Sequence, residues 1–237
     1  MKHIGILAHT ADGAALCFLE IIRESARRLG THRHPEITLS ILPLAEVLEA
    51  YDRGDLAAVN VQLIRTCQRL ADAGCNFYVC PANSAHIAVD AATEPYPLPG
   101  LHIADIVVRQ AAFEGRRRVA LLGTRWTMEG PVYPAAFARA GVDLAVPEPE
   151  ERAQIDRIIL EELCRGVITE ASRAAYVRII ERMRRAGCDA VALSCTEIPL
   201  LVTPEVSPLP TLDSTRLLAH AAVDEALALM AAPEAPT

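Results

Sequence analysis

The chain has 237 residues, of which 51% are hydrophobic and 22% are charged, so it can bury the core of one large or two small domains without disulfides or metals. Its net charge of -7 argues against nucleic acid as a partner, because binding phosphate requires a concentrated basic surface. No apolar run approaches the roughly 20 residues that span a bilayer and no signal-peptide pattern follows Met1, so we expect no membrane partner and a cytoplasmic location.

The first half of the chain alternates short apolar runs with amphipathic segments, a pattern that predicts strands joined by helices. The expected elements are a strand over 4–8, a helix over 14–29, a strand over 36–42, helices over 45–51 and 56–73, a strand over 77–80 and a helix from 101 to 113. His9 and Thr10 follow the first strand and precede a helix N-terminus, a place suited to an anion, although Asp12 as a plain N-cap explains the same turn. Asn83 and His86 follow the third strand, and for His86 a capping or packing role competes with a catalytic one.

The second half repeats this alternation. The expected elements are a strand over 119–122, a helix over 133–140, a strand over 142–146, a turn over 147–150, helices over 155–164 and 172–186, a strand over 190–193, a returning segment over 209–215 and a closing helix over 216–230. Strands that alternate with helices throughout predict a parallel sheet in each half. In such sheets ligands lie at the carboxyl ends of the strands. Thr124 and Thr127 follow one strand and are therefore candidate groups for binding a carboxylate.

The stretch over 186–201 is a buried strand that ends in a cysteine. Ser194, Cys195, Thr196 and Glu197 come where the strand leaves the sheet, and a helix-breaking proline follows. A thiol at this edge is placed for chemistry. The alternative is a small buried hydrophobe, since free cysteine is among the most buried residue types.

The seven cysteines of the chain are an odd number, and they form neither a CxxC motif nor a Cys/His cluster with zinc spacing. We therefore expect free thiols and no metal site. The chain also lacks the glycine patterns of dinucleotide-binding and phosphate-binding loops, so no nucleotide cofactor is expected.

The two halves share a short sequence motif at a constant offset. The residues AGC at 73–75 recur at 186–188, an offset of 113 residues, and a buried strand follows each copy. In that register Ala82 matches Cys195. The opening strands of the halves agree at an offset of about 115 residues. We interpret the chain as two related units whose strand ends face a shared cleft, with chance similarity of alanine-rich segments as the alternative. The predicted domains are 1–114 with 213–237, and 115–212.

Six phrases spread over nearly the whole chain resemble those of one family: PANSAH (81–86), LHIAD (101–105), LLGTRWTM (121–128), ELCRG (162–166), CTEIPLL (195–201) and DST (213–215). The family is the cofactor-independent aspartate/glutamate racemase superfamily, which includes hydantoin racemase, maleate isomerase and arylmalonate decarboxylase. The resemblance implies two pseudo-symmetric flavodoxin-like α/β domains, each a parallel sheet flanked by helices, with the active site in the cleft between them. It also implies a small carboxylate substrate, no cofactor and a homodimer.

In this family, racemisation uses two thiols on opposite faces of the substrate's α-carbon, one to remove the proton and one to return it. By the resemblance, Cys195 is one acid/base group. Backbone amides and hydroxyls hold the developing carboxylate charge, and the remaining matched residues bind the substrate. These implied binding residues are Asn83, Ser84, Thr124, Thr127, Arg165, Thr196 and Glu197. His9 and Thr10 are added to the expected binding residues because of their place between the first strand and a helix N-terminus. Arg165 would meet a distal carboxylate, whereas an arginine that complements a helix dipole is the alternative.

The chain departs from the family at the first catalytic cysteine, where it has Ala82. Three interpretations follow: an impaired or purely ligand-binding homologue, a single-thiol decarboxylase in which Cys195 protonates an enediolate, or an enzyme in which another group serves the second face. The candidates for that other group are His9, Cys80, Ser84 and His86. The function we predict is a cofactor-independent amino-acid racemase or isomerase acting at the α-carbon of an acidic substrate, with the decarboxylase as the alternative.

Overall fold

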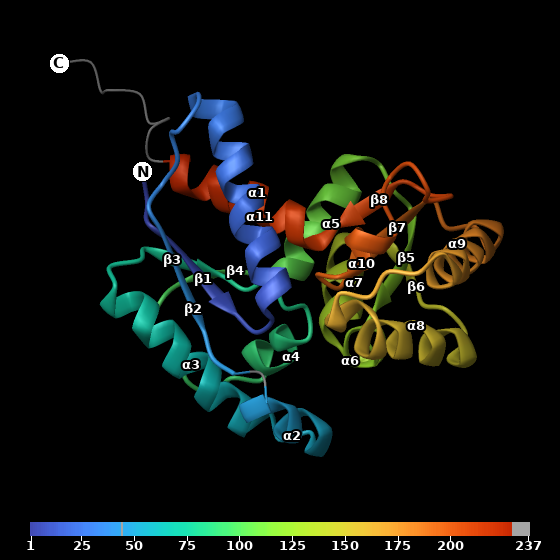
Figure 1. Cartoon of the computed structure of the whole chain (residues 1–237), viewed down its shortest axis with the longest axis horizontal. Helices are drawn as coiled ribbons and strands as arrows, with labels where there is room; N and C mark the ends of the chain where they lie inside the picture. Colours follow the sequence, from blue (N-terminus) through green and yellow to red (C-terminus); the bar gives the residue numbers. More distant parts are fainter. Residues whose placement is uncertain (44, 229–237) are drawn as a thin grey trace.

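Each half of the chain forms one parallel sheet of four strands (Figure 1). This computed structural model describes residues 1–43 and 45–228. The strands are β1 (Ile4–Ala8), β2 (Ile37–Ile41), β3 (Phe77–Val79), β4 (Gly100–Leu101), β5 (Arg118–Gly123), β6 (Asp143–Ala145), β7 (Ala190–Ser194) and β8 (Thr211–Asp213). Their order is β2-β1-β3-β4 in the first sheet and β6-β5-β7-β8 in the second. The predicted fold of two α/β units, each built on a parallel sheet, is confirmed.

Helices cover both faces of each sheet (Figure 1). They are α1 (Ala11–Leu29), α2 (Ala45–Arg53), α3 (Leu56–Asp72), α4 (Ala85–Asp90), α5 (Ile103–Phe113), α6 (Arg125–Glu129), α7 (Val132–Ala140), α8 (Pro149–Glu161), the 3-10 turn η1 (Leu163–Arg165), α9 (Glu170–Arg185), α10 (Ile198–Leu201) and α11 (Ser214–Leu227). In the first half, α1 and α11 pack on one face of the sheet, and α2 and α3 pack on the other. In the second half, α5 and α7 lie on one face, and α8 and α9 lie on the other.

Helices α5 and α11 connect the two halves. Helix α5 buries Ile103 and Ile106 in the core of the first half and Val107 and Val108 in the core of the second. A helix that is buried on two sides needs apolar residues around most of its circumference. Helix α11 returns the chain from the second sheet to α1, and Asp213 caps its start by accepting hydrogen bonds from the backbone of the first turn. The two sheets are therefore held together by shared hydrophobic packing.

The strand registers repeat between the halves. Ile4 of β1 pairs with Phe77 of β3, and Val119 of β5 pairs with Ala190 of β7. The strands β1 and β5 therefore correspond at an offset of 115 residues, and β3 and β7 correspond at 113. These are the offsets of the sequence repeat, and the shared strand order supports the same duplication.

Three of the differences between the predicted and the observed segments concern helix ends. Helix α8 begins at Pro149, inside the expected turn over 147–150, because Glu148 and Glu151 form a capping box and proline suits a first helical turn. Pro199, expected to break a helix, lies in the first turn of α10, where its missing N–H costs no intrahelical hydrogen bond. The helix predicted over 216–230 is observed as far as Leu227, and its last two positions lie outside the described residues.

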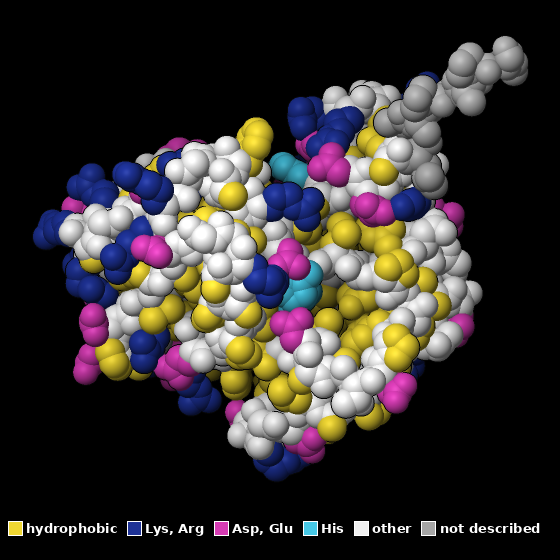
Figure 2. Space-filling model, turned by 180° about the vertical axis from the view of Figure 1, so that it is seen from behind, with side chains coloured by type: hydrophobic (Ala, Val, Ile, Leu, Met, Phe, Trp, Pro, Cys, Tyr) yellow, Lys and Arg dark blue, Asp and Glu magenta, His cyan; other side chains and the backbone are white. Residues whose placement is uncertain are grey.

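Across residues 1–43 and 45–228, no helix combines the length and apolar composition needed to cross a bilayer. Figure 2 shows the molecule from behind, where hydrophobic side chains gather in a hollow over the half that carries the N-terminus.

Candidate active site

A small cavity lies where strands of the two sheets end. The polar lining from the first half is His9 and Thr10 after β1, and Asn83 and Ser84 after β3, with Ala82 beside them. The polar lining from the second half is Thr124, Thr127, Ser194, Cys195, Thr196 and Glu197, which follow or end β5 and β7. The cavity has a volume of 90 Å³. A single water occupies about 10–15 Å³ on this scale, so the space suits a small molecule.

Cys195 lines this cavity directly after β7. Its side chain is 7% exposed and also contacts the core of the second half. The Cys195 thiol donates a hydrogen bond to Glu197 Oε2 over 3.0 Å, and the Thr196 hydroxyl donates to the same oxygen over 2.6 Å. Burial first, and then the Glu197 charge, raise the pKa of Cys195 well above its usual value. The resting thiol is therefore protonated at neutral pH and suited to donate a proton.

The loop that carries Cys195 packs against the start of helix α1. A Cβ at Gly13 would lie 2.5 Å from the Thr196 side chain, so only glycine allows this approach. Thr10 is the N-cap of α1, but its side chain makes no capping hydrogen bond, and Asp12 is exposed in the first turn. The first amides of α1 therefore have no side-chain cap at Thr10, and a helix N-terminus in this state attracts a carboxylate.

Asn83 lines the cavity, but its amide joins the two halves. Its Oδ1 accepts a hydrogen bond from the Tyr133 hydroxyl over 2.6 Å, and its Nδ2 donates to Ser214 Oγ over 3.1 Å. The Ser214 hydroxyl donates in turn to the Leu193 carbonyl of β7 over 3.1 Å. Asn83 therefore positions the PANSAH loop against the strand that leads to Cys195.

Three residues supply hydroxyl or imidazole groups to the cavity with few competing bonds. Thr124 and Thr127 are 3.2 Å apart through their hydroxyls, and no side-chain hydrogen bond to another described residue occupies the His9 ring. Burial lowers the pKa of His9 to about 4, so its imidazole is neutral at neutral pH. Tyr51 packs edge-on against His9 with ring centroids 6.0 Å apart.

Two predicted site residues lie outside the lining of the cavity. His86 is 1% exposed, its Nε2 hydrogen-bonds to the Cys80 carbonyl over 3.0 Å, and its ring packs against His102. Burial lowers the pKa of His86 to about 3, which fits the packing role considered for it. Arg165 is exposed at the end of η1, and its neighbour Cys164 lines the cavity instead.

Cys80 lies in the hydrophobic core of the first half rather than in the cavity lining. Its side chain is fully buried, and this burial raises the pKa of its thiol to about 12. Of the four groups considered for the second face, His9 and Ser84 line the cavity, whereas Cys80 and His86 do not.

Several residues that line the cavity were not candidates in the sequence, because they lack a strongly polar side chain. Their shared feature is an apolar or weakly polar side chain on a helix or turn: Leu48, Tyr51, Trp126, Ile159, Leu160 and Cys164. Trp126 and Tyr51 come from different halves and pack with ring centroids 5.7 Å apart. Amphipathic helices over 45–53 and 149–161 were the available signal, but periodicity does not say which apolar positions border a cavity rather than the core.

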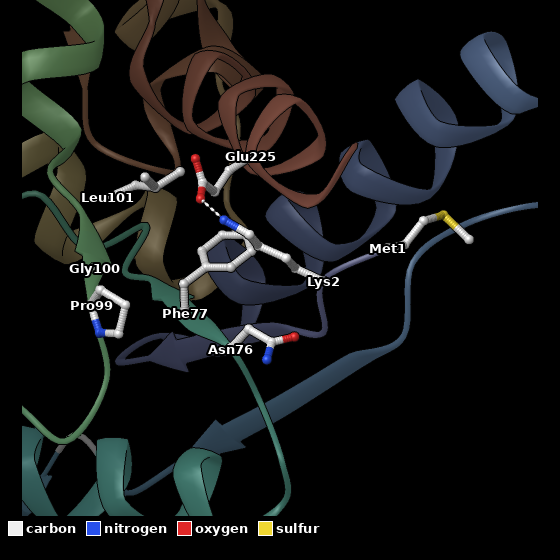
Figure 3. Close-up of a pocket in the computed structure, with 8 residues that line it drawn as sticks. All are labelled: Met1, Lys2, Asn76, Phe77, Pro99, Gly100, Leu101 and Glu225. Atoms are coloured by element: carbon white, nitrogen blue, oxygen red, sulfur yellow. Dashed lines mark hydrogen bonds and ion pairs between the residues drawn. The ribbon is translucent and has the colours of Figure 1, made fainter. Parts of the chain in front are cut away.

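A second cavity lies at the amino ends of the first sheet (Figure 3). It is lined by residues that precede or start β1, β3 and β4, among them Asn76 and Gly100, and has a volume of 290 Å³. Its charged groups, Lys2 and Glu225, already form an ion pair with each other. Ligands of parallel sheets bind at the opposite, carboxyl edge. The Cys195 cavity is therefore the candidate active site.

The chain is similar to known proteins over most of its length. A family model described as Asp/Glu/Hydantoin racemase matches residues 13–222. The glutamate racemase of Beutenbergia cavernae is 32% identical over 160 residues, which are 64% of this chain and 52% of that protein, so the match spans about half of that relative. A crystal structure from Yersinia pestis, described as a candidate Asp/Glu racemase, aligns with a TM-score of 0.86 and 32% identity over 96% of this chain and 100% of that one. An aspartate racemase homologue from Pyrococcus horikoshii aligns with a TM-score of 0.81 and 26% identity over 95% and 99% of the two chains.

Proposed function

Because this chain belongs to the Asp/Glu/hydantoin racemase family, we propose that it is an amino-acid racemase that moves a proton at the α-carbon, with Cys195 as one acid/base group. The observation that carries the proposal is the thiol of Cys195 in a small cavity whose other wall comes from the first half of the chain. A protein thiol and a second protein group can move both protons, so the proposal requires no cofactor.

The substrate's α-carboxylate would lie at the start of α1, near the hydroxyls of Thr124 and Thr127. Amides and hydroxyls at this place stabilise the charge that develops on the carboxylate oxygens when the α-proton leaves. Cys195 then donates its thiol proton to the α-carbon, which forms the new C–H bond and leaves a thiolate. These roles match the protonated resting state of the Cys195 thiol.

Ala82 occupies the position that corresponds to Cys195 in the other half, and it has no proton to exchange. We assign the second face to His9, which lines the cavity from the first half and is neutral because burial lowers its pKa to about 4. Its imidazole accepts the α-proton as the C–H bond breaks. Solvent then returns the imidazolium and the Cys195 thiolate to their resting states.

Chiral chromatography of L- and D-amino acids incubated with the protein tests this proposal. We expect both enantiomers to interconvert, and we expect Cys195→Ser to lose at least about 100-fold in rate, the usual contribution of one acid/base group. The matched control is Cys188→Ser, which replaces another buried cysteine of the second half outside the cavity. Equal activity of Cys195→Ser and Cys188→Ser would overturn the assigned role.

The alternative function is decarboxylation of a disubstituted malonate. Two observations favour it: the cavity has an alanine at the second face, and the Cys195 thiol rests in the protonated form. One C–C bond breaks, carbon dioxide leaves, and Cys195 donates its proton to the α-carbon of the resulting enediolate. Release of carbon dioxide from such a malonate, without α-proton exchange in any amino acid, would select this function over racemisation.

A further inference from the structure

The charge inside the cavity conflicts with a dicarboxylate substrate. Among the residues that the structure describes, neither lysine nor arginine lines the cavity. Its acidic residue is Glu197, and His9 is neutral at neutral pH because burial lowers its pKa to about 4. The distal carboxylate of aspartate or glutamate would therefore be desolvated without a cationic partner, which is unfavourable.

Two arginines that adjoin lining residues in the sequence, Arg125 and Arg165, do not line the cavity themselves. Arg165 is exposed on η1 and does not line the cavity. The Arg125 guanidinium lies over the ring of Trp126, 5.6 Å from its centroid, and Arg125 is exposed. Neither arginine supplies the bidentate partner that a buried carboxylate needs.

The apolar lining of the cavity comes mainly from helices. Leu48 and Tyr51 belong to α2, Trp126 belongs to α6, and Ile159 and Leu160 belong to α8. The polar lining comes instead from the strand ends, where the α-carboxylate and the acid/base groups are proposed to lie. A substrate bound in this way directs its side chain toward hydrocarbon and aromatic rings.

We propose that the substrate is a monocarboxylic amino acid with an apolar side chain, of the size of valine, leucine or methionine, rather than aspartate or glutamate. This inference rests on the racemase function proposed above and names its substrate class. An apolar pocket discriminates by about tenfold or more for each methylene group that it buries, and it excludes a carboxylate that it cannot pair.

Hydrogen–deuterium exchange at the α-carbon tests the inference with the whole chain. In deuterated buffer, we expect kcat/KM for leucine or methionine to exceed that for aspartate and glutamate by at least about 100-fold, as two methylene-sized contacts provide. Equal or faster exchange of aspartate or glutamate would overturn the inference and leave the racemase function intact.

Thermal stabilisation by the same amino acids separates the two proposals when no exchange occurs. Stabilisation by leucine or methionine but not by aspartate would support the apolar site and overturn the catalytic function. Stabilisation by aspartate or glutamate alone, or by none of these amino acids, would overturn the apolar site.

A cation introduced into the apolar wall gives a second test. Leu160 lines the cavity and is 43% exposed, so Leu160→Arg can extend into it without disturbing the core. We expect this variant to raise the ratio of glutamate to leucine turnover at least tenfold. The matched control is Leu19→Arg, at an exposed leucine of α1 outside the cavity lining. An unchanged ratio in Leu160→Arg would contradict the proposed position of the substrate's side chain.

Discussion

Restoring a thiol at position 82 should add a more effective acid/base group on the face that we assign to His9. Ala82 corresponds to Cys195 in the strand registers of the two halves, is half-buried, and lines the same cavity. Replacing one methyl hydrogen by a sulfur adds a single heavy atom beside a cavity of 90 Å³. The Ala82→Cys variant should therefore fold with the new sulfur directed at the substrate.

The size of the expected rate increase follows from the usual contribution of one positioned acid/base group. General acid–base catalysis contributes about 10²–10⁴-fold, which is about 3–5 kcal/mol of activation free energy. The sequence neighbours of position 82 are Pro81, Asn83 and Ser84, and none of them is charged. No adjacent carboxylate therefore raises the pKa of the new thiol, whereas Glu197 raises the pKa of Cys195. An ordinary thiol is about half ionised near pH 8.5. We therefore expect racemisation to increase by about 100-fold at that pH, at the lower end of the range.

Chiral chromatography at pH 8.5 measures this gain, with Ala58→Cys as the matched control. Ala58 is likewise a half-buried alanine against the core of the first half, but it lies outside the cavity lining. The reasoning is refuted if Ala82→Cys folds, reacts with a thiol reagent at the new residue and racemises no faster than Ala58→Cys.

Three further predictions concern the contacts around the site. Gly13→Ala should destabilise the protein by about 1–3 kcal/mol in urea unfolding because its Cβ meets the Cβ and both outer atoms of the Thr196 side chain. The loss should be smaller in a Thr196→Gly background, where all three contacting atoms are absent, and an equal loss in both backgrounds would contradict the contact. His86 has a pKa of about 3 when folded and 6.5 as a free side chain, so the unfolded state binds more protons between these values and stability falls as pH falls. Urea unfolding should show a loss of about 2 kcal/mol from this residue between pH 7 and pH 5, and His86→Gln should remove that part of the slope; an unchanged slope would show that His86 is not buried in its neutral form. Glu197→Gln should speed iodoacetamide alkylation of Cys195 at pH 8 by roughly tenfold or more, because the variant removes a negative charge 3.0 Å from the thiol. Mass spectrometry of the Cys195 peptide measures the alkylation rate, and an equal rate in both proteins would contradict this prediction.

The strand ends could be predicted from the sequence because they depend on local patterns. Buried runs such as the one over 190–193 end in polar residues, and parallel sheets bring such ends to one edge. The correspondence of Ala82 with Cys195 was also readable, since the repeat offset of 113 residues reappears in the strand registers. These signals depend on neighbours in the chain and on the period of the strand.

The side-chain contacts inside the site could not be predicted because they join distant residues. Asn83 was expected to bind substrate, but its amide bonds to Tyr133 and Ser214, which are 50 and 131 residues away in the sequence. Arg165 was expected to point a cation at the cleft, but the 3-10 turn after α8 leaves it exposed and brings Cys164 to the cavity. Leu48 has the spacing of any amphipathic helix, and only the packing of α2 places it at the cavity.

Proton NMR in deuterated buffer tests the central claim most directly, because it follows the α-proton itself. The account predicts that the unaltered protein replaces the α-proton of leucine or methionine by deuterium, that Cys195→Ser loses at least about 100-fold of this rate, and that Cys188→Ser retains it. Exchange that continues undiminished in Cys195→Ser would show that the thiol between the two halves does not carry the reaction.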